Sequence, residues 1–67
     1  MMTIQFNGQP KQVEQETTVE ELLLEAGVPI KFCAVERNLE IVPKPEYRTL
    51  KLEAGDAIEV VTLVGGG

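Results

Sequence analysis

The chain has 67 residues, so it forms one domain at most, and a domain of this size buries only about 60% of the surface that its unfolded form exposes. Eleven acidic and six basic residues give a formal net charge of −5, which disfavours binding to nucleic acid. This charge suits a positively charged protein partner, although solubility alone explains it equally well. No apolar run reaches the roughly 20 residues of a membrane span. Residues 1–4 lack the features of a signal peptide, so we expect a cytoplasmic protein.

The first segment predicts a β-hairpin. Residues 2–6 alternate between apolar and polar side chains, as a half-buried strand does. Asn7 and Gly8 follow, and this pair is typical of a type I′ turn because both central residues of that turn take positive φ. The return strand is expected over residues 11–14. Pro10 places it at an edge of the sheet, since proline cannot donate a backbone hydrogen bond.

A short helix is predicted next, capped by Thr17 or Thr18 and ended by Gly27. Thr18 and Glu21 have the spacing of a capping box, in which each side chain bonds to the backbone N–H of the other residue. The apolar residues recur at helical spacing and form one stripe: Val19, Leu22, Leu23 and Ala26. Gly27 suits the left-handed conformation that ends many helices.

The second half of the chain predicts short strands separated by turns. Strands are expected over residues 32–37, 40–42 and 57–64, with turns at 38–39 and 53–56 and a tight or helical turn at 46–48. One helix covers only one face of the resulting sheet, which indicates a two-layer α+β domain with a mixed sheet of four to five strands. The order permits a β-grasp (ubiquitin-like) arrangement, in which the last strand lies beside the first and parallel to it. The order alone does not require that topology.

Few residues in the chain suit catalysis or metal binding. The sequence has no histidine and one cysteine, so it offers neither a Cys–His pair nor a zinc site. Cys33 lies among apolar residues, where we expect a packed and inert thiol. Asp56 follows Gly55 in a turn, where local backbone hydrogen bonding is its expected role. No glycine-rich loop precedes the helix, so we expect no bound nucleotide or other cofactor.

The remaining feature is the run of three glycines at residues 65–67. A glycine run is usual in a linker. It also suits a tail that passes through a channel too narrow for side chains, where its carboxylate can react. The residues alone leave these two interpretations about even. We therefore divide the chain into a folded domain over 1–64 and a glycine tail over 65–67.

The whole chain resembles the ThiS family, the sulfur carriers of thiamine biosynthesis. The resemblance rests on four segments: Phe6-Asn7-Gly8, Thr18-x-x-Glu21-Leu22-Leu23, Val35-Glu36-Arg37-Asn38-x-Glu40-Ile41-Val42, and Gly55-Asp56-x-Ile58-Glu59-Val60-Val61-x-x-Val64-Gly65-Gly66-Gly67. The last segment is the most specific. The chain departs from the family at Lys44, where many members have arginine, and at Pro45, which stiffens the turn.

The resemblance implies a β-grasp fold and a mechanism at the tail. A ThiF-type enzyme would use ATP to adenylate the carboxylate of Gly67, and sulfur supplied from cysteine by a desulfurase would then form a thiocarboxylate. Thiazole synthase would accept that sulfur. Gly65 and Gly66 would give access to the reacting carboxylate. In this scheme the chain is a carrier and not an enzyme.

Side-chain alternation suggests a surface that docks on such partners. If Ile4, Phe6, Val35, Ile58 and Val60 face the helix, several apolar side chains point the other way. The expected partner surface consists of Phe32, Ala34, Val61, Leu63 and Val64. The alternative is that sheet twist and loops cover these side chains.

Two other functions stay open. The small subunit of molybdopterin synthase is also a sulfur carrier with a Gly-Gly end, although it is usually longer. A ubiquitin-like module could bind a partner without any chemistry at its tail.

Overall fold

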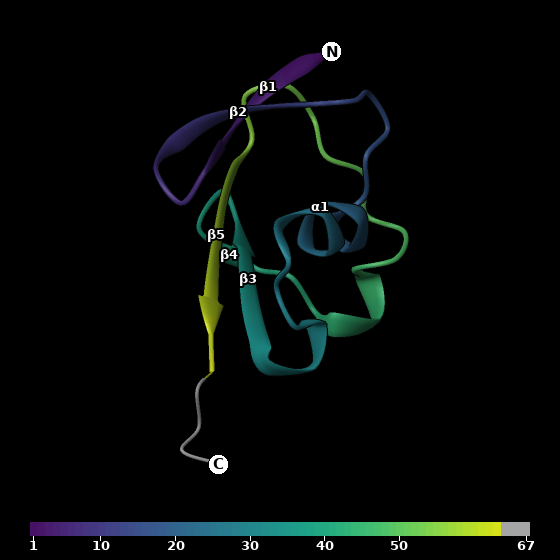
Figure 1. Ribbon diagram of the computed structural model, residues 1–67, viewed down its shortest axis with the longest axis vertical. Helices are drawn as coiled ribbons and strands as arrows, with labels where there is room; N and C mark the ends of the chain where they lie inside the picture. The colour runs from purple at the N-terminus through teal and green to yellow at the C-terminus, as the bar shows by residue number, and fades with distance from the viewer. Residues whose placement is uncertain (64–67) are drawn as a thin grey trace.

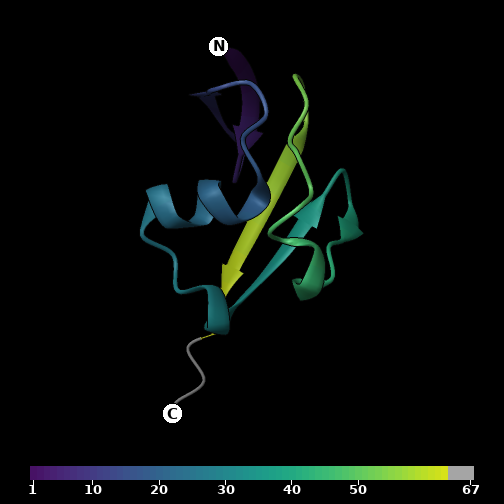
Figure 2. The same ribbon diagram turned by 90° about the vertical axis from the view of Figure 1, so that its right-hand side faces the viewer.

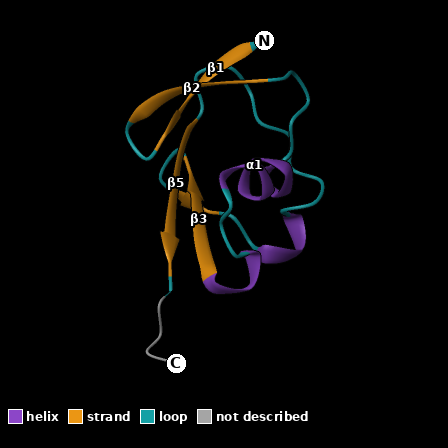
Figure 3. Ribbon diagram, viewed as in Figure 1, coloured by secondary structure: helices purple, strands orange, loops and turns teal. Residues whose placement is uncertain are grey.

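The computed structural model describes residues 1–63, which contain one α-helix and five strands. Figure 3 colours the strands orange, and the α-helix and short 3₁₀ turns purple. In chain order the elements are β1 (Met2–Phe6), β2 (Gln9–Val13), α1 (Val19–Ala26), β3 (Cys33–Arg37), β4 (Glu40–Ile41) and β5 (Ala57–Thr62). Two 3₁₀ turns, η1 (Ile30–Phe32) and η2 (Lys44–Glu46), connect them. Val64, Gly65, Gly66 and Gly67 lie outside the described residues.

The strands form one mixed sheet in the order β2-β1-β5-β3-β4. The first and last strands run parallel at its centre, with Gln5 opposite Ala57 and Phe6 opposite Ile58. All other neighbours are antiparallel. Figure 1 shows α1 and the 3₁₀ turns on one side of this sheet, and Figure 2 shows β5 running diagonally behind α1. This is the β-grasp arrangement, and the α+β prediction is confirmed.

The helix begins and ends where its capping residues predicted. Thr18 accepts a hydrogen bond from the backbone N–H of Glu21, and the Glu21 carboxylate accepts one from the backbone N–H of Thr18. The backbone N–H of Val19 donates to the carbonyl of Leu50 at 3.0 Å, which ties the following loop to the start of the helix. Gly27 ends the helix with a φ of 73°, in the left-handed region that glycine adopts at little cost.

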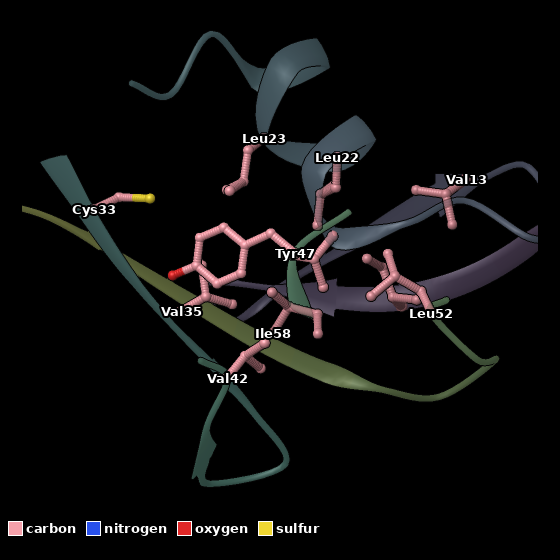
Figure 4. Close-up of a cluster of buried hydrophobic side chains, with 11 residues drawn as sticks. Val13, Leu22, Leu23, Cys33, Val35, Val42, Tyr47, Leu52 and Ile58 are labelled. Carbon is pink, nitrogen blue, oxygen red and sulfur yellow. The ribbon is translucent and has the colours of Figure 1, made fainter. Parts of the chain in front are cut away.

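The core lies between α1 and the helix-facing side of the sheet. Figure 4 shows the Tyr47 ring between the leucines of α1 and the side chains of Val35 and Ile58. The side chains predicted to face the helix do so: Ile4, Val35 and Ile58 are buried, and Phe6 and Val60 pack partly buried against the core.

Several element boundaries differ from the prediction. Phe32 belongs to η1 and not to a strand, because a 3₁₀ turn joins the helix to β3. Ala26, predicted on the apolar stripe, is the last residue of α1 and is exposed. The helical turn predicted at 46–48 occurs at η2, where Pro45 supplies a φ suited to the first helical positions. The last strand ends at Thr62 within the described residues.

Candidate functional site

The site begins where β5 leaves the sheet, directly before the glycines. Thr62 pairs with Cys33 in the β3–β5 ladder, and the backbone N–H of Leu63 donates to the carbonyl oxygen of Phe32 at 2.6 Å. The chain is therefore held to the body of the domain up to its last described residue. Gly65, Gly66 and Gly67, the predicted reactive tail, fall outside the described residues, so their role stays a prediction.

A lysine holds the segment that anchors Leu63. Lys44 Nζ donates a hydrogen bond of 2.7 Å to the carbonyl oxygen of Lys31, the residue before Phe32. This contact joins η2 to η1. Lys44, noted above as a departure from the family pattern, thus binds the residue next to Phe32, whose carbonyl oxygen accepts the hydrogen bond from Leu63.

The start of β5 is fixed by a buried carboxylate. Asp56 accepts hydrogen bonds from Arg37 Nε at 2.9 Å, from Asn38 Nδ2 at 3.1 Å and from the backbone N–H of Glu53 at 2.8 Å. The Glu53 contact confirms the predicted local turn bond. The other two join this turn to the β3–β4 turn, which sequence reasoning did not predict.

Four of the five residues predicted to form a partner surface lie together on the face of the sheet that α1 does not cover: Phe32, Ala34, Val61 and Leu63. Ala34 and Val61 are directly opposite each other in the β3–β5 ladder, so their side chains share one face. The large apolar members are exposed: Phe32 by 58%, Val61 by 60% and Leu63 by 54%. Ala34 is half-buried, and Val64 lies outside the described residues. Docking of a partner on this face stays a prediction.

One apolar member of this face was missed. Ile41 is 66% exposed and pairs with Glu36, which places its side chain on the same face as Ala34 and Val61. The alternation of Glu40, Ile41 and Val42 could have indicated this, because Val42 is buried on the helix side.

The single cysteine is packed, as expected. Cys33 is buried, and its Sγ donates a weak hydrogen bond of 3.6 Å to the carbonyl of Ile30. Burial raises the pKa of the neighbouring Tyr47 phenol, and the Cys33 thiol adds to that shift. These groups lie inside the core, away from the exposed face.

Within residues 1–63, no group of three or more histidine, cysteine or carboxylate side chains could hold a metal ion. A groove of about 390 Å³ beside the start of α1 is lined mainly by polar and acidic residues: Val13, Glu14, Gln15, Glu16, Thr17, Glu21 and Glu25. It contains no nucleophile paired with a base. The described part of the chain also has no helix that is long and apolar enough to cross a membrane.

A family model described as "ThiS family" matches residues 4–67, which include both the exposed face and the glycines. The chain belongs to the ThiS family. The crystal structure of the thiamine biosynthesis protein ThiS from Geobacter metallireducens has the same fold, with a TM-score of 0.84 at 30% identity. That match covers 98% of this chain and 100% of the other.

Two curated relatives differ in length. The sulfur carrier protein ThiS of Bacillus subtilis (strain 168) is 38% identical over 96% of this chain and 98% of its own. A thiazole synthase of Paramagnetospirillum magneticum is 46% identical over 98% of this chain, but the chain spans only 20% of that protein. Sequence similar to this chain thus occurs both as a separate protein of nearly the same length and as one part of a longer thiazole synthase.

Proposed function

We propose that this chain is a sulfur carrier of thiamine biosynthesis and that it carries sulfur as a thiocarboxylate on Gly67. The observation that carries the proposal is the family match over residues 4–67, which extends through the glycines. A relative of nearly equal length is named a sulfur carrier protein. The β-grasp fold and its contacts at Leu63 support a folded domain over 1–64 with a reactive tail over 65–67.

The proposed chemistry takes place on the tail. An oxygen of the Gly67 carboxylate attacks the α-phosphate of ATP in a ThiF-type enzyme, and pyrophosphate leaves. The persulfide sulfur that the desulfurase takes from cysteine then attacks the acyl carbon and displaces AMP. A thiol reductant cleaves the S–S bond of the resulting acyl disulfide and leaves the thiocarboxylate. Thiazole synthase transfers this sulfur to its substrate in exchange for an oxygen atom, which restores the carboxylate of Gly67. The chain is therefore a regenerated substrate and not an enzyme. We place these steps in the cytoplasm, where ATP is available.

The uncovered face provides the proposed docking surface. Phe32, Ala34, Val61 and Leu63 lie on this face, and the proposed surface also includes Val64, the next residue in the chain. Exposed apolar side chains that lie together on a small domain suit a protein interface. A partner that binds here would contact the domain next to the tail on which it acts.

Intact-protein mass spectrometry tests the proposal. The chain is incubated with ATP, magnesium, cysteine, a reductant, a cysteine desulfurase and a ThiF-type enzyme. We expect a mass gain equal to the exchange of one oxygen for sulfur, located by fragmentation at Gly67. Because a relative contains similar sequence within a longer chain, the starting mass must first show a free carboxylate at Gly67.

Two controls sharpen the result. A variant without Gly67 should gain no sulfur if the glycine length is set for the adenylation site. The thiocarboxylate form of the protein is then offered to thiazole synthase and, separately, to molybdopterin synthase. The enzyme that accepts its sulfur shows which of the two carrier pathways the chain serves. A wild-type tail that stays unmodified would contradict the proposal and favour a ubiquitin-like module without tail chemistry.

A further inference from the structure

The uncovered face of the sheet is organised as three rows that run across the strands. Ile41, Glu36 and Glu59 form the first row through their register in β4, β3 and β5. Ala34 and Val61 form the second row, and Phe32 and Leu63 lie next to each other beyond it. Two glutamates therefore border an apolar surface that extends toward the tail.

Glu36 and Glu59 are directly opposite each other in the β3–β5 ladder. Their Cα atoms lie in register in a hydrogen-bonded position, where opposed residues are about 5.5 Å apart. Like charges in such a position destabilise a sheet. Neither carboxylate has a salt-bridge partner among residues 1–63.

Two basic side chains in this half of the chain, Arg37 and Lys44, are engaged elsewhere. Arg37 follows Glu36 but pairs with Ile58, whose buried side chain places both on the helix side. There Arg37 binds Asp56 and lies 3.8 Å from Glu53. Lys44 donates to the backbone carbonyl of Lys31. The acidic pair thus keeps an unfavourable arrangement that one external cation would relieve.

We propose that Glu36 and Glu59 together receive one arginine or lysine side chain of the adenylating enzyme that acts on Gly67. The methylene stem of such a side chain can lie along Val61 and Ile41 while its charged group lies between the two carboxylates. The inference rests on the function proposed above and specifies the partner's chemistry: a basic side chain surrounded by apolar ones.

A second copy of the chain fits this face poorly. A two-fold symmetric contact would bring the same surface of each copy together and place two acidic pairs at one interface. The net charge of −5 on each copy adds to that repulsion. Charge complementarity therefore favours a basic partner over self-association.

The test is a charge reversal, Glu59→Lys, in the full chain. This change replaces a repulsive cross-strand pair by an attractive one, so the urea midpoint of unfolding should rise. The reversed charge should also repel the partner's cation. With the ThiF-type enzyme and ATP, the KM for the carrier in pyrophosphate exchange should rise roughly tenfold or more, with little change in kcat.

Glu14→Lys is the matched control. Glu14 is exposed beside the start of α1, and its replacement by lysine changes the net charge by the same amount as Glu59→Lys. Its KM should stay within about threefold of wild type. An unchanged KM for Glu59→Lys, with wild type adenylated normally, would overturn this inference alone. A lower urea midpoint would also overturn it, because the pair would then stabilise the fold. Failure of wild type to be adenylated would overturn the proposed function, and this inference with it.

Discussion

Asn7 Oδ1 accepts a hydrogen bond of 2.7 Å from the backbone N–H of Val60, 53 positions along the chain. The backbone N–H of Asn7 also donates to the carbonyl of Ile58 at 2.8 Å. In a regular parallel ladder the Asn7 carbonyl would accept from Val60, but the positive φ of 51° at Asn7 turns the chain into the hairpin. The side chain takes the place of the carbonyl, so one residue ends β1 and holds the middle of β5.

Replacement of Asn7 by alanine should lower the free energy of unfolding by about 2 kcal/mol, from loss of one hydrogen bond and from strain at positive φ. Asn7→Gly should cost only about 1 kcal/mol, because glycine adopts this φ freely but lacks the acceptor. Urea unfolding followed by circular dichroism measures both. Equal losses in the two variants would show that strain at positive φ contributes nothing, whereas an unchanged stability of Asn7→Gly would show that the bond to Val60 contributes nothing.

Asp56→Ala should destabilise the fold by about 2 to 3 kcal/mol, because Arg37 and Asn38 lose a common acceptor. The value lies at the low end for a buried ion pair since Arg37 keeps contact with water. A double-mutant cycle with Arg37→Ala measures the coupling between the two side chains. Strict additivity of the two single changes would contradict a direct interaction.

The local elements were predictable because their signals lie within a few residues. Thr18 and Glu21 cap the helix through each other, and Asn7 and Gly8 select the hairpin turn without reference to the rest of the chain. The bond from Val60 to Asn7 has no such signal, because it depends on the parallel alignment of the first and last strands. The contacts of Asp56 with Arg37 and Asn38 were missed because they depend on the antiparallel register between β3 and β5.

In the candidate site, too, the features with a local sequence signal were predicted and those that depend on contacts between strands were not. Alternation along β5 predicted that Val61 and Leu63 face away from the helix, since successive side chains in a strand alternate between faces. It did not predict that Glu59 lies opposite Glu36 or that Ile41 completes the row. Those relations depend on the register between strands, which the chain sets through its long-range packing.

The raised pKa of Tyr47 leads us to expect that the free energy of unfolding falls at alkaline pH. Burial raises its pKa above the ordinary value of 10.0, with the Cys33 thiol as the second cause. The folded state therefore favours the neutral phenol. This contribution to stability is fully present below pH 10.0 and is lost as the pH rises through the native pKa.

The single tyrosine makes this measurable, because near-ultraviolet tyrosinate absorbance reports Tyr47 alone. Its titration midpoint in the native protein should exceed that in urea. Tyr47→Phe should show a flatter decline of stability above about pH 10, because the variant lacks the phenol. Identical pH profiles for the two proteins would contradict the assignment.

Leu63→Asp tests the apolar surface next to the tail. Leu63 is exposed, so the substitution should change the free energy of unfolding by no more than about 0.5 kcal/mol. A charged carboxylate in an apolar interface should raise the KM of the carrier for the ThiF-type enzyme roughly tenfold. Pyrophosphate exchange at varied carrier concentration gives this value.

Leu39→Asp is the matched control. Leu39 is 87% exposed in the β3–β4 turn, at the opposite end of β3 from Phe32 and Leu63, and aspartate tolerates its φ of 71°. The same leucine-to-aspartate change there should leave adenylation unaltered. Similar KM values for the two variants, whether both raised or both normal, would show that the face formed by Phe32, Val61 and Leu63 does not bind the enzyme.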